Sequence, residues 1–318
     1  MSSPLPENNH APEQTLEVAR ARPLLGTLVQ IRASGAPSRI QGAVDSAFAA
    51  IERVQQLLSY QDPDSELSAL NQQALFEPRK VHAETYAVLC AALHFARLSE
   101  GAFDPCVGFD LEQWGLLPRR TSKRPHAGTG RGSWRDIELL ADRQVCLHGP
   151  VHVDLGGIAK GYAVDLALQA LVAGGARDIL VNAGGDLRVA GPRARQIALR
   201  HPLAPDASGE SLTLLNAALA TSGAYFSRQQ RPDGEVSALL DPSGRAPHLG
   251  VGSVSVRAAS CMSADALTKV VLFAPPALAE RALAACDAMA FVQQPHATVT
   301  VGYPRHSPAH IGGASHAH

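Results

Sequence analysis

Three features are missing from this chain of 318 residues, and each absence excludes a class of protein. No apolar run approaches the ~20 residues that a membrane-spanning helix needs, so we expect no membrane span. Lys and Arg number 28 against 29 for Asp and Glu, and this balance does not favour nucleic acid or an acidic membrane as a partner. The five cysteines are odd in number and contain no Cys-x-x-Cys pair, which favours reduced thiols over disulfides or a zinc site.

The two ends of the chain differ in composition from the middle. The first ten residues have no basic start, no apolar core and no lipid-attachment cysteine, which predicts no export signal and a cytoplasmic location. Residues 1–19 are rich in Pro, Asn and Glu and predict a disordered arm, and residues 306–318 predict a flexible tail. Residues 20–305 form the expected domain, because a hydrophobic content of 46% can supply a sizeable core. The oligomeric state is left open.

Hydrophobic spacing predicts helices and strands in separate groups. Apolar residues at steps of three and four predict helices over residues 43–58, 83–98, 264–273 and 277–286. Strands are expected at residues 28–33, 178–181, 187–190, 211–215, 237–240, 252–256 and 298–301. Grouped strands with helices between the groups favour an α+β fold. The basic segment 117–133 predicts a solvated loop, because it lacks the interleaved aromatic residues of a nucleic-acid patch.

The glycine-rich stretch 153–165 is the most informative part of the sequence. Glycines at 156, 157 and 161 surround the lone Lys160, after a strand-like piece at 151–153 and before a helical pattern that starts at Tyr162. Glycines at a strand-to-helix turn let the backbone approach a ligand, and the start of a helix attracts an anion. The stretch is neither a P-loop nor a Gly-x-Gly-x-x-Gly fingerprint. A phosphate cradle and a tight structural turn with a surface lysine therefore remain alternatives.

This stretch also resembles a known family. Residues 154–165 read Asp-Leu-Gly-Gly-Ile-Ala-Lys-Gly-Tyr-Ala-Val-Asp, which is similar to the signature of the ApbE family, the FAD:protein FMN transferases. Further segments resemble the family's motifs in the same order, at residues 24–27, 58–71, 101–108, 182–186, 221–223 and 264–267. The resemblance spans residues 20–305. It implies an α+β fold related to the tunnelling fold, with mixed sheets and flanking helices.

The resemblance implies a reaction and a metal. FMN moves from the substrate FAD to a Ser or Thr hydroxyl of a target flavoprotein, and AMP leaves. Mg²⁺ is implied, with the backbone carbonyl of Gly157, the carboxylate of Asp265 and a hydroxyl four residues later as ligands. Lys269 stands at that last position, and an ammonium cannot ligate a metal. Either Thr268 serves instead, or the charge of Lys269 replaces part of the metal's charge, or the metal is lost; an exposed lysine on a helix flank is the remaining alternative.

The resemblance also implies contacts with the flavin nucleotide and catalytic groups. The implied cofactor-binding residues are Leu25, Tyr60, Ala102, Phe103, Asp104, Asp154, Lys160 and Thr268. Lys160 and Asp241 are the implied catalytic residues. Asp104 could equally be a turn-forming residue before Pro105, and for Asp186 a hairpin turn is favoured over an active-site acid.

One departure from the family weakens the catalytic assignment. The family pattern His-Ile-Ile-Asp-Pro has Ala238 in place of its histidine here, and alanine cannot accept a proton from an attacking hydroxyl. The leading expectation is a transferase. The alternatives are a protein that binds FAD without transferring it and a pyrophosphatase that releases FMN and AMP without a protein target.

Overall fold

An eight-stranded antiparallel sheet is the centre of the computed structural model, which describes residues 15–119, 132–201, 204–294, 297–302 and 311–312. Its strand order is β1-β2-β6-β7-β10-β15-β16-β17. The bounds are β1 Leu16–Leu24, β2 Thr27–Gly35, β6 Arg177–Ala183, β7 Asp186–Ala190, β10 Ala218–Gly223, β15 Ser253–Ala258, β16 Met289–Gln294 and β17 Ala297–Val301. The α+β prediction is confirmed.

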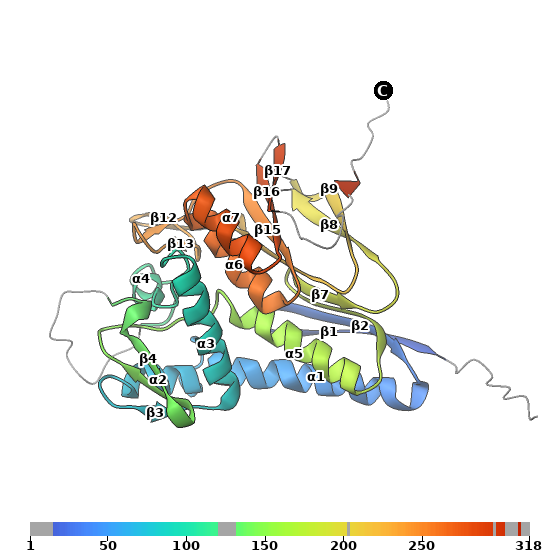
Figure 1. Cartoon of the computed structure of the whole chain (residues 1–318), viewed down its shortest axis with the longest axis horizontal. Helices are drawn as coiled ribbons and strands as arrows, with labels where there is room; N and C mark the ends of the chain where they lie inside the picture. Colours follow the sequence, from blue (N-terminus) through green and yellow to red (C-terminus); the bar gives the residue numbers. More distant parts are fainter. Residues whose placement is uncertain (1–14, 120–131, 202–203, 295–296, 303–310, 313–318) are drawn as a thin grey trace, which may run out of the picture.

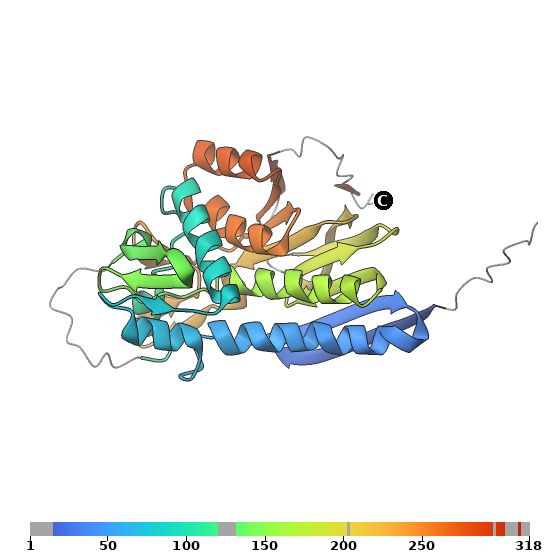
Figure 2. The ribbon, with the colours of Figure 1, turned by 60° about the horizontal axis from the view of Figure 1, so that its bottom comes forward.

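Three helices cover one face of this sheet (Figures 1 and 2). They are α1 (Pro37–Leu58), α5 (Ala159–Ala173) and α6 (Cys261–Phe273). In α1 the buried residues recur at steps of three and four, so one stripe of the helix faces the core. Helix α5 has buried residues on most of its surface, because it is packed between α1 and α6 as well as against strands.

The middle of the sheet is buried on both faces, whereas every second residue of most of β2 is exposed. Ala218 and Ala220 of β10 pack into the large core under the helices. Leu219, between them, packs into a second core on the other face, with Leu212 and Leu214 of β9 (Ala204–Leu214). Because successive side chains of a strand point to opposite faces, burial on both sides makes every residue at 218–220 apolar.

The remaining elements surround this centre. One end of the molecule carries α2 (Glu66–Gln73), α3 (Ala83–Leu98), α4 (Gly108–Gln113) and the small sheet β3-β5-β4 (Arg79–Lys80, Gln144–Leu147 and Ile137–Leu140) (Figure 1). The other elements are β8 (Arg195–His201), β11 (Gln229–Arg231), β12 (Gly234–Val236), β13 (Leu240–Asp241), β14 (Ala246–Pro247), α7 (Pro276–Ala285), β18 (Ile311–Gly312) and single 3-10 turns at Trp134–Asp136, Ala141–Arg143 and Ala224–Phe226. Among the residues described, none of the helices has both the length and the apolar character that crossing a membrane requires.

Several predicted boundaries need correction. Strand β1 begins at Leu16, inside the predicted disordered arm 1–19, because it pairs along its whole length with β2 in a hairpin. Residues 1–14 lie outside the described residues. Within the predicted tail 306–318, β18 pairs with β9, and the other residues of the tail lie outside the described part. Most of the predicted loop 117–133 also lies outside it, at 120–131.

Of two strands predicted beside the site, one is absent and the other is shorter than predicted. Residues 151–153 form no strand; their backbone is held instead by the side chain of Asn71, which accepts from Val153 N at 2.8 Å and donates to Val153 O at 2.9 Å. The strand predicted at 237–240 is reduced to Leu240–Asp241. Neither segment forms the full predicted strand, because hydrophobic alternation along a segment does not show whether another strand pairs with it.

Candidate active site

The glycine turn joins the extended segment at 151–153 to α5. Helix α5 begins at Ala159, three residues before the predicted start, so Lys160 lies in its first turn. Asp154 N donates to Pro105 O at 2.7 Å, and Asp154 Oδ1 accepts from Gly156 N at 3.2 Å. The N-cap residue of α5 makes no side-chain cap, but Gly161 N in the first turn donates to Asp265 Oδ2 at 3.3 Å. These contacts fix the turn, and the 15-residue helix that follows directs the positive end of its dipole toward it, which favours an anion there.

Lys160 lies between two buried carboxylates. Its ammonium donates to Asp186 Oδ2 and, at 3.5 Å, to Asp265 Oδ2. Asp186 and Asp265 are only 4% and 1% exposed, whereas the lysine side chain is 34% exposed. Burial alone would lower the pKa of Lys160, but the negative charges of Asp186 and Asp265 outweigh it and raise this pKa above its ordinary value. The lysine is therefore charged at neutral pH.

A second lysine reaches the same carboxylate from α6. Lys269 Nζ donates to Asp265 Oδ1 and, at 3.0 Å, to the carbonyl oxygen of Asp265. Burial would raise the pKa of Asp265, but the charges of Lys160 and Lys269 lower it below its ordinary value. The pKa of Asp186 is raised by burial and by the charge of Asp265. The alternative of an exposed lysine is wrong, because the Lys269 side chain is 14% exposed and paired.

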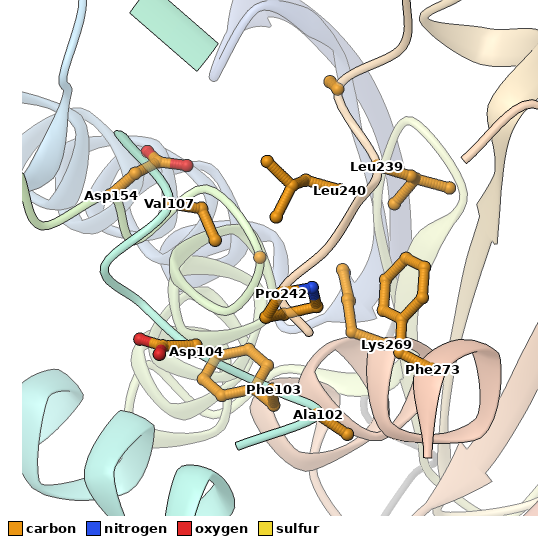
Figure 3. A pocket seen from close by; sticks show the side chains of 12 residues that line it. Ala102, Phe103, Asp104, Val107, Asp154, Leu239, Leu240, Pro242, Lys269 and Phe273 are labelled. Atoms are coloured by element: carbon orange, nitrogen blue, oxygen red, sulfur yellow. The ribbon is translucent and has the colours of Figure 1, made fainter. Parts of the chain in front are cut away.

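A pocket of about 660 Å³ opens beside these lysines. Predicted site residues on its wall are Leu25, Tyr60, Asp154, Gly157, Lys160 and Lys269. A smaller pocket of about 60 Å³ shares Asp154, Gly157 and Lys269 with it and is also lined by Ala102, Phe103 and Asp104. In Figure 3, Lys269 and Phe273 enter the smaller pocket from α6, and Ala102, Phe103 and Asp104 enter it from the chain before α4. The structure thus places nine of the predicted site residues on the walls of these two adjoining pockets.

Leu25 reaches this wall through a strained turn. Leu25 and Gly26 join β1 to β2 with φ angles of 56° and 69°, and Leu25 N donates to Gln55 Oε1 at 2.6 Å. A left-handed conformation is unfavourable for leucine, and such strain clusters at functional sites. Tyr60, on the same pocket, donates its hydroxyl to Glu112 Oε1 at 2.5 Å. Both residues present apolar surface that suits a flat ring.

Known proteins resemble this chain over most of its length. The model of the ApbE family matches residues 25–292. The chain belongs to the ApbE family. It is 31% identical over 281 residues to the FAD:protein FMN transferase of Treponema pallidum, covering 79% of this chain and 77% of that protein. It is also 31% identical over 271 residues to the FAD:protein FMN transferase of Vibrio cholerae, covering 79% of each.

Solved structures of the ApbE family have the same fold. The crystal structure of the ApbE protein from Thermotoga maritima matches with a TM-score of 0.72 at 28% identity, over 87% of this chain and 94% of that one. The flavin transferase ApbE from Vibrio cholerae matches with a TM-score of 0.71 at 25% identity, over 90% of this chain and 97% of that one. The family resemblance inferred from the motifs is confirmed.

Three predicted site residues of this ApbE family member have other partners than expected. Thr268 Oγ1 donates to Asp265 O and is paired with Ser222 Oγ on β10, each at 2.7 Å, so its hydroxyl is directed into the protein and not to either pocket. Asp241 Oδ1 accepts from the backbone and hydroxyl of Ser243, and Asp241 lines neither pocket. Asp104 accepts from Cys106 N at 2.8 Å and Trp134 N at 3.3 Å, which supports its turn-forming alternative.

Asp186 is the site residue that sequence reasoning undervalued. It directly follows the turn at Gly184 and Gly185, as a hairpin residue does, but its carboxylate is buried against Lys160. The motif 182–186 of the ApbE family was the available signal. Asp165 was not singled out at all; its carboxylate accepts from Cys261 N and Met262 N, each at 2.9 Å, and so joins α5 to the start of α6.

The residues at the implied magnesium site do not fit that ion. Gly157, Asp265 and Lys269 do come together, but both carboxylate oxygens of Asp265 already accept from ammonium groups. Mg²⁺ needs oxygen ligands at about 2.0–2.1 Å and keeps several waters, and lysine offers no lone pair while it is charged. In the part of the chain that the structure describes, no group of three His, Cys, Asp or Glu residues could hold a metal ion.

The buried state of Asp154 gives a prediction for pH. Burial raises its pKa, against the opposing effects of the Gly156 amide and of the two lysines. The folded protein therefore holds this proton more tightly than the unfolded chain, so stability falls as pH rises from the ordinary carboxyl pKa through the raised one. We expect Asp154→Asn to lose this part of the pH dependence. Urea unfolding from pH 3.5 to 7 measures it; a difference between variant and wild type that is constant over this range contradicts the assignment.

Proposed function

We propose that this chain is an FAD:protein FMN transferase, which moves FMN from FAD to a Ser or Thr hydroxyl of a target flavoprotein and releases AMP. One observation carries the proposal: the glycine turn, the start of α5 and two lysine ammonium groups meet on the wall of one pocket of about 660 Å³. That combination suits the diphosphate of a dinucleotide. The shared family and the names of its relatives support the reaction.

The chemistry is a phosphoryl-type displacement. The acceptor hydroxyl oxygen forms a bond to the phosphorus of the FMN half, the bond from that phosphorus to the bridging oxygen breaks, and AMP leaves with the electron pair. The hydroxyl proton passes to a base. Lys160 and Lys269 stabilise the charge that develops on the diphosphate. Ala238 cannot take the proton, so we assign that role to Asp241. Because Asp241 itself lines neither pocket and only its neighbours Leu240 and Pro242 line the smaller one, it would reach the hydroxyl through a water molecule.

A transfer assay tests the function. Purified protein is incubated with FAD and an acceptor flavoprotein that lacks its covalent FMN, with and without Mg²⁺. We expect the acceptor to gain the mass of one FMN while an equal amount of AMP appears. FMN and AMP that form without an acceptor indicate a pyrophosphatase. Bound FAD without either product, across several acceptors, indicates a binding protein and rejects the transferase.

The proposal assigns no magnesium ion, because the expected ligands do not fit one. For location, we propose the cytoplasm. All five cysteines are free, and two of them, Cys106 and Cys261, lie buried near the site, where they remain thiols most readily in a reducing compartment. Fractionation of cells that express the full-length protein checks this; recovery of the protein in an exported fraction contradicts it.

A further inference from the structure

Lys269 fills the space between α6 and the glycine turn. Its aliphatic part lies across Gly157, since a Cβ on that glycine would lie 3.5 Å from Lys269 Cε and 3.9 Å from Cδ. Its ammonium contacts Asp265 through both the carboxylate and the carbonyl oxygen. Lys269 lines the smaller pocket, as Figure 3 shows, and also the larger one. A positive charge is therefore built into the wall where the glycine turn and α6 meet.

The balance of charge at this wall depends on that lysine. Lys160 and Lys269 carry two positive charges, and Asp186 and Asp265, which they contact, carry two negative charges. These four groups are neutral together, and Asp154 on the same wall adds a further buried carboxyl group whose charge both lysines favour. With an uncharged residue at 269, the same cluster would carry a net negative charge beside a diphosphate and would need an added cation.

We propose that the Lys269 ammonium takes the place of a divalent cation at the diphosphate of FAD, so that this chain binds FAD without metal. The inference rests on the proposed function and states how that site recognises its substrate. An ammonium has three N–H donors and binds phosphate oxygens as a point charge. Lys160 contributes the second ammonium on the same wall, on the other side of the Asp265 carboxylate.

Calorimetric titration with FAD tests this, in EDTA and in millimolar Mg²⁺. For the wild type we expect the same dissociation constant in both buffers, within about twofold. For Lys269→Thr in EDTA we expect binding to weaken about tenfold or more, because hydrogen bonds to charged groups are lost. Mg²⁺ should then restore the binding of this variant, since threonine supplies a hydroxyl ligand four residues after Asp265.

Lys269→Met is the matched control, because it removes the charge without adding an oxygen ligand. It should bind FAD as weakly as Lys269→Thr in EDTA and should gain nothing from Mg²⁺. Electron paramagnetic resonance of Mn²⁺ in the absence of FAD measures, as a second test, whether each variant binds a divalent metal. We expect bound Mn²⁺ for Lys269→Thr and none for the wild type or for Lys269→Met. Circular dichroism shows whether each variant is folded.

The results separate this inference from the proposed function. A wild type that binds FAD in EDTA but transfers no FMN retains the inference and rejects the transferase. A wild type that binds or transfers only with Mg²⁺ retains the transferase and overturns the inference. Mn²⁺ bound by the wild type, or unchanged FAD binding by both Lys269 variants, also overturns it. Absence of FAD binding in both buffers overturns both.

Discussion

Replacing Lys160 by methionine is expected to reduce FMN transfer by about 100-fold or more and to lower the free energy of unfolding by about 3 kcal/mol. The stability loss arises at Asp186, which is 4% exposed and has this ammonium as its partner, whereas Asp265 keeps Lys269. Removing one partner of a buried ion pair leaves an uncompensated charge. The activity loss arises because the diphosphate loses one of two ammonium groups. Urea unfolding and the transfer assay measure the two effects.

A double variant separates the two roles of Lys160. Adding Asp186→Leu to Lys160→Met removes the carboxylate that has lost its ammonium partner. Replacing a buried ion pair by apolar residues often leaves stability unchanged. Most of the lost stability should return, while transfer should stay low. A double variant as unstable as the single one would show that the stability loss does not arise from Asp186. Recovery of transfer would show that Lys160 acts only through Asp186.

The helices were the most predictable part of the fold. The helix predicted at 83–98 matches α3, and the one predicted at 43–58 lacks only the first six residues of α1, because a repeating apolar stripe is a property of the local sequence. Strand β1 was not predicted at all. Val18 is its only buried residue, and its structure comes from pairing with β2 rather than from its own pattern.

The site was predictable to the extent that it depends on spacing along the chain. Asp265 and Lys269 are four residues apart on a helix, so their contact follows from helical geometry. Asp186 meets Lys160 only because β7 lies beside α5 in the fold, and no spacing indicates that. The inward direction of Thr268 depends on Ser222, 46 residues away, and so it could not be predicted from α6 alone.

Gly161→Ala adds a single methyl group to α5, and we expect it to lower the free energy of unfolding by about 3 kcal/mol. A Cβ at this position would lie 2.3 Å from Cys261 O, 2.6 Å from Cys261 C and 2.8 Å from Met262 Cα. All three are backbone atoms at the start of α6, so no side chain can rotate away. That start is also held by Asp165, so α5 and α6 must separate for the methyl group to fit.

The same separation should weaken FAD binding, because Gly161 N donates to Asp265 Oδ2 at 3.3 Å and the two lysines reach this carboxylate from opposite helices. Gly42→Ala is the matched control. Gly42 is an exposed residue of α1 with no atom within 4 Å of an added Cβ, so alanine should stabilise by about 0.5–1 kcal/mol through helix propensity. Urea unfolding and FAD titration compare the two. We expect the same Gly→Ala substitution to destabilise at position 161 and to stabilise at position 42, because only Gly161 contacts the backbone of another helix. Equal effects at the two positions would mean that α5 and α6 do not meet at Gly161. The arrangement of Lys160, Asp265 and Lys269 around that contact would then be wrong.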